Sequence, residues 1–388
     1  MVGQEQFLPY DRPPLSKQIL SGDWKSEEAF LREDSDYDKL CIDWRLGKRA
    51  SELDLDARAV MLEDGQSIAF DGLVIATGAT PRRIPGMHDL EGVYVLRTMD
   101  DAIAIRAELE SGPRVCVVGA GFIGAEVAAV CRAKGLDVTI IEALEAPLAH
   151  ILPPELARAC VKLHLDHGVD LRCNSAVIGF EGSPRVEAVR VAGGEKVPAD
   201  LVVVGIGVLP ETGWLASSGL ELDNGIICDA TLATKAPAVV AAGDVARWPN
   251  VIFGETMRIE HWTNALEQGA AAARRLLGGP NYTQPFASVP YVWSDQYETK
   301  IQIVGQIKPN DDVCVVQGSL EEGQFVALAG RGGRLVAAFA FNEPRKVISW
   351  RQPIATGMPW RDALTKAAQR NQNDQAKVSP ISSLSRDG

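Results

Sequence analysis

The stretch Val115-Cys116-Val117-Val118-Gly119-Ala120-Gly121-Phe122-Ile123-Gly124 decides the fold of this chain. Its four apolar residues predict a buried strand, its three glycines predict a tight loop, and the Ala- and Val-rich run that follows predicts a helix. A second apolar run, 138–141, ends at Glu142, which lies 142 − 119 = 23 residues after the first glycine. The pattern predicts a βαβ unit with a dinucleotide-binding fingerprint in its glycine loop.

The spacing of the fingerprint gives each residue a physical task. Gly119 permits the tight turn, Gly121 lets backbone amides approach a pyrophosphate, and Gly124 allows the helix to pack closely on the strand. The helix N-terminus stabilises the anion. Glu142 can bind both ribose hydroxyls and repels a 2′-phosphate, so NADH is favoured over NADPH. The alternative is that the glycines serve only a tight strand-to-helix turn.

Two segments with the same layout indicate an internal duplication. Residues 72–81 and 201–210 each consist of an apolar strand that runs into a glycine turn and ends in proline. Each follows short alternating strands, at 59–70 and 186–197, so we expect each to close a separate nucleotide-binding domain. A further strand, 239–244, ends in Gly-Asp, where the carboxylate can reach a cofactor hydroxyl or simply cap a helix.

Length and composition predict a folded globular protein. At roughly 100–200 residues per domain, 388 residues predict two or three domains, and 46% hydrophobic with 23% charged residues argues against disorder and coiled coil. The formal net charge of −12 disfavours nucleic acid and anionic membrane surfaces as partners. No apolar stretch approaches the ~20 residues that span a bilayer, so we expect no membrane attachment.

The seven cysteines are scattered along the chain, and the two closest in sequence, Cys160 and Cys173, are 173 − 160 = 13 residues apart. No CxxC or CxxxxC pair can therefore form a dithiol or a zinc site locally, and we expect no metal. An odd number of cysteines in a chain without a recognisable signal peptide predicts a cytoplasmic location.

Two further strings add to these motifs, Pro-Tyr-Asp-Arg-Pro-Pro-Leu-Ser-Lys at 9–17 and Tyr-Val-Trp-Ser-Asp-Gln-Tyr at 291–297. In this combination the chain resembles the FAD-dependent NAD(P)H:ferredoxin reductase family, of the rhodocoxin, putidaredoxin and dioxygenase reductase type, from about residue 1 to about residue 350. The resemblance implies an α/β fold with two Rossmann-like domains and a small α+β C-terminal domain. It also implies the cofactors FAD and NAD, with electrons passing from NADH through FAD to a [2Fe–2S] ferredoxin that serves an oxygenase or a cytochrome P450.

The domain organisation implied by the resemblance is a FAD domain interrupted by an NAD domain. The first part of the FAD domain is expected at 1–108, the NAD domain at 109–228 and the second part of the FAD domain at 229–286. A C-terminal cap over the flavin is expected at 287–366. The polar tail, 367–388, is expected to be disordered.

One departure from the family pattern concerns the beginning of the chain. Such reductases carry two glycine fingerprints, and this sequence holds only the internal one. Residues 1–5 look like the end of the FAD domain's second strand, with Glu5 as the ribose carboxylate, so we expect the preceding βα unit, roughly 30 residues, to be missing. A flavin-free NAD-binding protein is therefore one alternative function. The other is an apoptosis-inducing-factor-like NADH oxidoreductase with a different acceptor, such as a quinone or oxygen.

The resemblance also implies site residues. Lys17, near the flavin, pairs with Glu126, and these two are the catalytic candidates; the alternatives are a solvated lysine and a glutamate favoured by the helix dipole. Arg12 contacts FAD and Asp244 bonds a ribityl hydroxyl. The same motifs supply the other cofactor-binding candidates: Ala76, Thr77, Gly78, Ile123, Gly205, Ile206, Gly207, Gly243, Glu260, His261, Trp262 and Trp293. The two tryptophans are expected to flank the isoalloxazine, and no acid–base role is expected for His261.

A ferredoxin partner needs a docking surface on this acidic chain. Because ferredoxins are usually acidic, we expect a local basic patch in the cap, formed by Arg345, Lys346 and Arg351 with Arg331 and Arg334 nearby. The chain is expected to act as a monomer or a homodimer.

Overall fold

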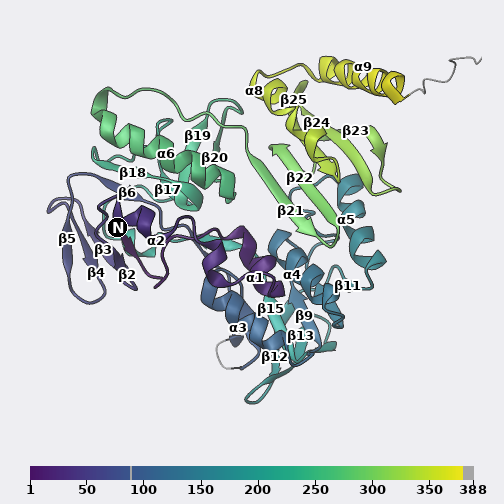
Figure 1. Cartoon of the computed structure of the whole chain (residues 1–388), viewed down its shortest axis with the longest axis horizontal. Helices are drawn as coiled ribbons and strands as arrows, with labels where there is room; N and C mark the ends of the chain where they lie inside the picture. The colour runs from purple at the N-terminus through teal and green to yellow at the C-terminus, as the bar shows by residue number, and fades with distance from the viewer. Residues whose placement is uncertain (88–89, 379–388) are drawn as a thin grey trace, which may run out of the picture.

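A computed structural model describes residues 1–87 and 90–378. The chain forms three parts (Figure 1): an outer unit (1–81 and 208–286), an inserted unit (93–204) and a cap (291–378). Within the described ranges, no helix combines the length and the apolar character that a membrane crossing requires. The α/β class expected from the sequence, with a separate C-terminal part, is confirmed.

The inserted unit is built on a parallel sheet of five strands in the order β11-β10-β9-β15-β8. The predicted βαβ unit is confirmed, because its strands pair side by side and its helix begins directly after the glycine loop. The elements are β8 (Val93–Val95), α3 (Met99–Leu109), β9 (Val115–Val118), α4 (Phe122–Ala133), β10 (Val138–Ile141), α5 (Pro154–Asp166), β11 (Asp170–Arg172) and β15 (Leu201–Val204). All four residues of β9 are buried, as expected for the central strand of a parallel sheet.

The outer unit has the same kinds of element in a more open arrangement. Two of its sheets are separate parallel pairs, β1 (Val2–Gly3) with β2 (Arg45–Leu46) and β6 (Leu73–Ile75) with β18 (Val239–Ala241). Helix α6 (Trp262–Gly278) contacts β6 and β18. Six further strands form two three-stranded sheets: β3 (Ala50–Asp54), β4 (Ala59–Leu62) and β5 (Ser67–Ala69), and β17 (Ile226–Ile227), β19 (Ala246–Asn250) and β20 (Glu255–Met257).

The two repeated segments lie against each other. The first ends in β7 (Ala79–Pro81) and the second in β16 (Val208–Pro210), and these strands pair antiparallel, with Leu209 opposite Thr80. Each repeat also follows a three-stranded antiparallel sheet; in the inserted unit this is β12 (Val177–Gly182), β13 (Val186–Val191) and β14 (Lys196–Pro198). The layout therefore supports the internal duplication expected from the sequence.

Strand pairing moves two of the expected domain boundaries. Strand β8 pairs with β15 in the inserted sheet, so the boundary at 108/109 lies too far along the chain. The boundary at 228/229 is also too late, because Leu215 and Ile226 are fully buried in the core of the outer unit. The amino-acid composition does not change at either boundary. The unit to which each segment belongs is shown only by its strand pairing and by the core in which it is buried.

The cap is a five-stranded antiparallel sheet in the order β21-β22-β25-β24-β23. One cluster of core residues joins the sheet to α5 of the inserted unit, and a second cluster joins it to the C-terminal helices (Figure 1). The elements are β21 (Tyr291–Gln296), β22 (Thr299–Gly305), β23 (Asp312–Ser319), β24 (Gln324–Arg331), β25 (Arg334–Phe341), α7 (Pro344–Ile348), α8 (Arg351–Ala355) and α9 (Trp360–Val378).

The expectation of a disordered tail from residue 367 is wrong for 367–378, which continue helix α9, while 379–388 lie outside the described residues. The helix packs through two small residues one turn apart, Ala363 and Ala367, which are 0% and 3% exposed. Asn371 also donates a hydrogen bond to the carbonyl of Val316 on β23. A contact face made of alanines leaves the segment polar in composition, which is why its sequence resembled a disordered tail.

The tip of the β21–β22 hairpin joins the cap to the inserted unit. Tyr297, at this tip, stacks on His167 with 3.7 Å between the ring centroids, and its hydroxyl lies 2.9 Å from Nδ1 of His164. His164 is fully buried, and among the described residues its Nε2 has no hydrogen-bond partner. Burial, with a smaller contribution from His167, lowers the pKa of His164 to about 4. His164 is therefore neutral at pH 7.

This burial predicts a specific loss of stability in acid. Because the folded pKa lies below the unfolded value of about 6.5, the unfolded state binds the proton first, and stability falls as the pH drops from about 6.5 to 4. The loss is on the order of 3 kcal/mol. His164→Gln should flatten this part of the curve in chemical unfolding measured across the pH range. His150→Gln, which changes an exposed histidine, should leave the slope as in the wild type. An unchanged slope in His164→Gln would contradict the assignment.

Candidate functional site

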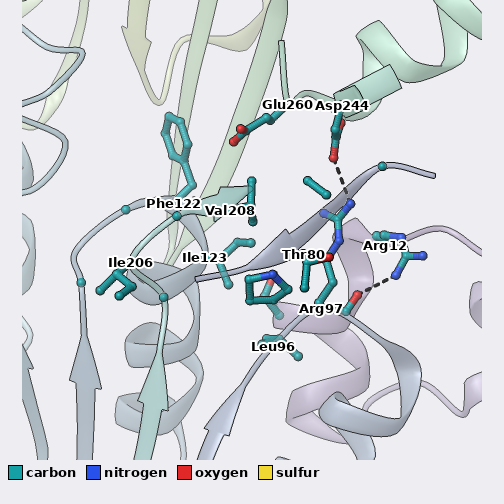
Figure 2. Close-up of a pocket in the computed structure, with 18 of the residues that line it drawn as sticks. Arg12, Thr80, Leu96, Arg97, Phe122, Ile123, Ile206, Val208, Asp244 and Glu260 are labelled. Carbon is teal, nitrogen blue, oxygen red and sulfur yellow. Dashed lines mark hydrogen bonds and ion pairs between the residues drawn. The ribbon is translucent and has the colours of Figure 1, made fainter. Parts of the chain in front are cut away.

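A cavity of about 1070 Å³ lies where the outer unit, the inserted unit and the cap meet. Every cofactor-binding or catalytic candidate from the sequence lines this cavity except Gly124. Figure 2 shows an apolar region, with Phe122, Ile123, Ile206 and Val208, and a polar region with charged side chains. The structure thus brings together residues spread from Glu5 to Trp293.

The glycine loop owes its shape to close backbone contacts. Gly119 has φ +97, and a Cβ there would lie 2.4 Å from the carbonyl oxygen of Gly205. At Gly124, the Cβ would lie 2.1 Å from the carbonyl oxygen of Gly119, which explains why Gly124 is buried behind the loop and does not line the cavity. Gly121 has open space where its Cβ would be, so its backbone is accessible to a ligand.

Glu142 lies at the carboxyl end of β10, beside the glycine loop. Its carboxylate accepts hydrogen bonds from the backbone N–H of Ala120 at 2.7 Å and of Leu144 at 2.9 Å. These contacts fix the side chain at the cavity wall, where it is 9% exposed. A carboxylate held at this place is suited to accept hydrogen bonds from a ribose and to oppose a second negative charge.

Lys17 and Glu126 meet at the junction of the three parts. Nζ of Lys17 lies 2.7 Å from the carboxylate of Glu126, which is 4% exposed. Ser16 and Ser294 donate hydrogen bonds to the two oxygens of the same carboxylate, at 2.5 Å and 2.7 Å. Lys17 also donates to the carbonyl of Pro13 at 3.2 Å. The ammonium group is thereby held on the cavity wall by an ion pair and a hydrogen bond.

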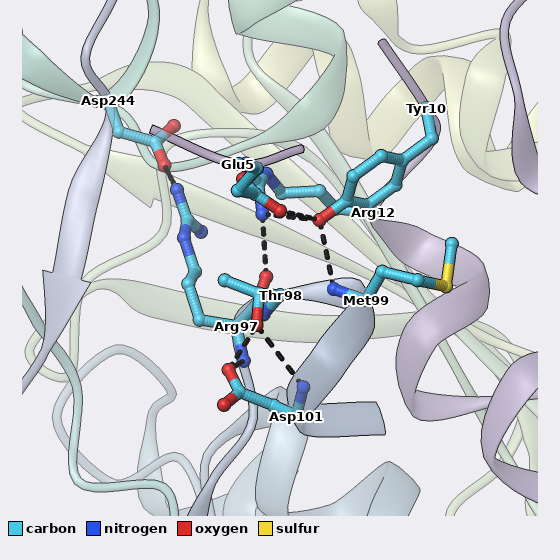
Figure 3. Close-up of polar contacts among 8 residues, drawn as sticks. All are labelled: Glu5, Tyr10, Arg12, Arg97, Thr98, Met99, Asp101 and Asp244. Carbon is cyan, nitrogen blue, oxygen red and sulfur yellow. Dashed lines mark hydrogen bonds and ion pairs between the residues drawn. The ribbon is translucent and has the colours of Figure 1, made fainter. Parts of the chain in front are cut away.

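A polar network crosses the other side of the cavity (Figure 3). Arg12 forms an ion pair with Glu5 at 2.6 Å and donates to the carbonyl of Arg97 at 2.7 Å. Arg97 in turn pairs with Asp244 at 2.9 Å. Tyr10 donates to Glu5, and burial raises the pKa of Tyr10, so the phenol keeps its proton. Two guanidinium groups are therefore oriented within the cavity, Arg12 by the nearby Glu5 and Arg97 by Asp244, which lies 147 residues further along the chain.

Two tryptophans form part of the cavity wall where α6 begins. The rings of Trp262 and Trp293 meet edge to face with 5.8 Å between centroids, and Nε1 of Trp262 donates to Asp11 at 2.8 Å. His261 precedes the helix, and burial lowers its pKa to about 4. The imidazole of His261 is therefore neutral at pH 7.

Arg97 is the main site residue that sequence reasoning missed. It follows β8 and immediately precedes Thr98, which with Asp101 forms a capping box at the start of α3. The carboxylate of Asp101 also accepts the backbone N–H of Arg97 at 3.0 Å. A capping box directly after an apolar strand marks a turn at the carboxyl edge of a sheet, where ligands bind, and this signal could have identified Arg97.

The lining residues fit two nucleotide cofactors. Gly119 and Gly124 allow close packing around a loop whose backbone is open at Gly121, which is what a pyrophosphate requires. On the other side, Arg12, Arg97 and Lys17 supply cations, and Thr77 and Gly78 bring backbone to the same wall. The volume lies at the upper end of typical ligand cavities, about 300–1,000 Å³, which suits more than one nucleotide.

Comparison with known proteins assigns the chain to a family. Residues 1–269 match the model of the pyridine nucleotide-disulphide oxidoreductases, and residues 291–372 match a reductase C-terminal domain. The chain is 38% identical over 362 residues to rhodocoxin reductase of Rhodococcus erythropolis, covering 92% of this chain and 84% of the relative. It is 39% identical over 368 residues to the anthranilate 1,2-dioxygenase system ferredoxin–NAD(+) reductase component of Burkholderia cepacia, covering 92% and 87%.

A solved structure has the same architecture. The crystal structure of a covalent putidaredoxin reductase–putidaredoxin complex superimposes with a TM-score of 0.89 at 32% identity, covering 97% of this chain and 92% of the matched chain. The fold, the cavity and the sequence identity lead to one assignment. The chain belongs to the pyridine nucleotide-disulphide oxidoreductase family and, within it, to the ferredoxin reductases.

Proposed function

We propose that this chain is a NADH-dependent reductase that passes electrons through FAD to a [2Fe–2S] ferredoxin serving an oxygenase or a cytochrome P450. The observation that carries the proposal is the single cavity that joins the glycine loop of the inserted unit to Lys17 and Trp293. A nicotinamide donor held by the loop and a flavin held by the outer unit would meet there. The similarity to the ferredoxin–NAD(+) reductase component of the anthranilate 1,2-dioxygenase system supports a ferredoxin as the acceptor.

The cysteines support an iron–sulfur acceptor over a disulfide. Among the described residues that line the cavity there is no cysteine. Burial raises the pKa of Cys116, Cys131, Cys160 and Cys228 to about 12, so these thiols stay protonated and unreactive. All seven cysteines are free, in agreement with a reducing compartment, and we propose a cytoplasmic location.

The residues of the cavity mainly position and stabilise the cofactors. FAD, when bound, accepts a hydride from NADH and releases the electrons one at a time. Lys17 places a positive charge at the junction, and its ion pair with Glu126 keeps the ammonium oriented without rearrangement during the reaction. Asp244 and Glu5 hold Arg97 and Arg12 in place for the phosphate-bearing parts of the cofactor.

Ferredoxin reduction tests the proposed function directly. Under anaerobic conditions, the FAD-loaded protein should use one NADH to reduce two molecules of a [2Fe–2S] ferredoxin, followed by the loss of the cluster's visible absorbance. NADH consumption with a quinone or oxygen but without reduction of ferredoxin would favour the alternative acceptor. Protein that binds NADH but stays colourless after incubation with FAD would indicate a flavin-free NAD-binding protein.

Glu142 predicts the choice of nicotinamide cofactor. We expect kcat/KM to be at least about tenfold higher for NADH than for NADPH, because the fixed carboxylate opposes a 2′-phosphate. Glu142→Gln should narrow the ratio, and Glu145→Gln, an exposed residue of the following loop, should leave it unchanged. Equal kcat/KM values for the two cofactors in the wild type would refute this role.

The position of Lys17 predicts an effect on the rate of flavin reduction without an effect on NADH binding. Lys17→Met should slow flavin reduction by NADH about tenfold or more, since a charge-assisted contact is worth about 1.5–3 kcal/mol. The affinity for NADH should change little. Lys39→Met, which alters a lysine whose side chain is 72% exposed, serves as the control in stopped-flow measurements. Reduction at the wild-type rate would remove Lys17 from the mechanism.

A further inference from the structure

The basic residues expected to form one docking patch in the cap do not share one environment. Arg331 pairs with Asp311 at 2.7 Å, and Arg351 pairs with Glu267 at 2.6 Å, so carboxylates neutralise both. Lys346 lies 3.0 Å from Glu343. Arg345 and Arg334 differ, because within the described ranges neither forms an ion pair, and of these two only Arg345 lines a cavity.

Arg345 instead lines a second, smaller cavity. Its volume is about 330 Å³, and Arg345, Lys346 and Arg370 all contribute to its wall. It lies between β23, α7 and α9, and β23 is at the opposite edge of the cap sheet from β21, which carries Trp293 (Figure 1). The two cavities share no lining residue.

The smaller cavity has an excess of positive charge. It contains three cations, and the only carboxylate bonded to any of them in the described part of the chain is Glu343. Lys346 is paired with Glu343, which leaves Arg345 and Arg370 without a carboxylate partner among the described residues. In a chain with a formal net charge of −12, a hollow lined by two such guanidinium groups is a local positive site that attracts anions.

Arg370 is held in position before any ligand binds. Its guanidinium lies 4.6 Å from the ring centroid of Trp350, and its Nη1 donates to Oγ of Ser349 at 2.7 Å. Ser349 in turn donates to the carbonyl of Lys346 at 2.6 Å. A guanidinium has five N–H donors, and these contacts leave most of them free for an anion. Such preorganisation lowers the entropic cost of binding.

From this arrangement we propose that the small cavity binds a phosphate group, either as inorganic phosphate or as a small phosphate ester. Arginines recognise phosphate oxygens in a bidentate manner, and Arg345 and Arg370 come from two different helices, α7 and α9. The bound anion would therefore link α9 to the rest of the cap. A hollow of about 330 Å³ suits a small anion better than the convex surface of a protein partner.

Calorimetric titration of the FAD-loaded protein tests the site. The protein is first saturated with NAD, so that the glycine loop of the large cavity cannot bind the added phosphate. Inorganic phosphate and glycerol phosphate are added in separate titrations, with chloride at matched ionic strength as a blank. We expect saturable binding of at least one of the two, and the titration that saturates identifies the source of the phosphate. Arg345→Gln should weaken the affinity about tenfold or more, and Arg361→Gln, an exposed position of α9 outside the cavity, should match the wild type.

Hydrogen exchange supplies a second readout that does not depend on activity. The ligand should slow amide exchange in 360–372, and Arg345→Gln should abolish that protection while leaving exchange in the ligand-free protein unchanged. The proposal fails if neither anion binds to the wild type, or if Arg345→Gln binds it equally well. Weaker binding of ferredoxin to Arg345→Gln without any phosphate binding would assign the cavity to a protein surface instead. Phosphate affinity and amide exchange do not depend on electron transfer to ferredoxin, so failure of the phosphate site can be told apart from failure of the proposed function.

Discussion

The carboxylate of Glu126 is the interaction on which the arrangement of this protein depends. It belongs to α4 of the inserted unit, yet its partners are Ser16 and Lys17 from the outer unit and Ser294 from the cap. A buried charge is tolerated only when it is paired and fully hydrogen-bonded, so all three parts must be in place to satisfy this one group. The large cavity is consequently well formed only when the chain is assembled around Glu126.

The charged groups of the large cavity differ from the overall charge of the chain. The sequence is acidic overall, with a formal net charge of −12, but Arg12, Arg97 and Lys17 line the large cavity. Each of these three cations is paired with a carboxylate, which keeps it oriented and lowers the cost of holding it out of water. Composition alone therefore describes the outer surface of this protein and says little about its ligand sites.

Sequence patterns predicted the inserted unit well because its constraints are local. Gly119 has a positive φ, Gly124 packs against the carbonyl oxygen of Gly119 five residues earlier, and the strands around them are uniformly apolar. The pairing of Lys17 with Glu126 came from the family resemblance, since their 109-residue separation leaves no local signal. Helix α9 was missed for a related reason, because a contact face of alanines acquires meaning only through partners far along the chain. For Arg97 the capping box that follows it is a local signal, but its ion pair with Asp244 joins positions 147 residues apart.

The antiparallel pairing of β7 with β16 has a mechanical consequence. These strands lie on the two stretches of chain that connect the inserted unit to the outer unit, so both connections run side by side. Two adjacent tethers that are bonded to each other behave as one strap, which bends and twists more readily than it slides apart. Any rocking of the inserted unit would therefore turn about this strap, along an arc that the backbone itself prescribes.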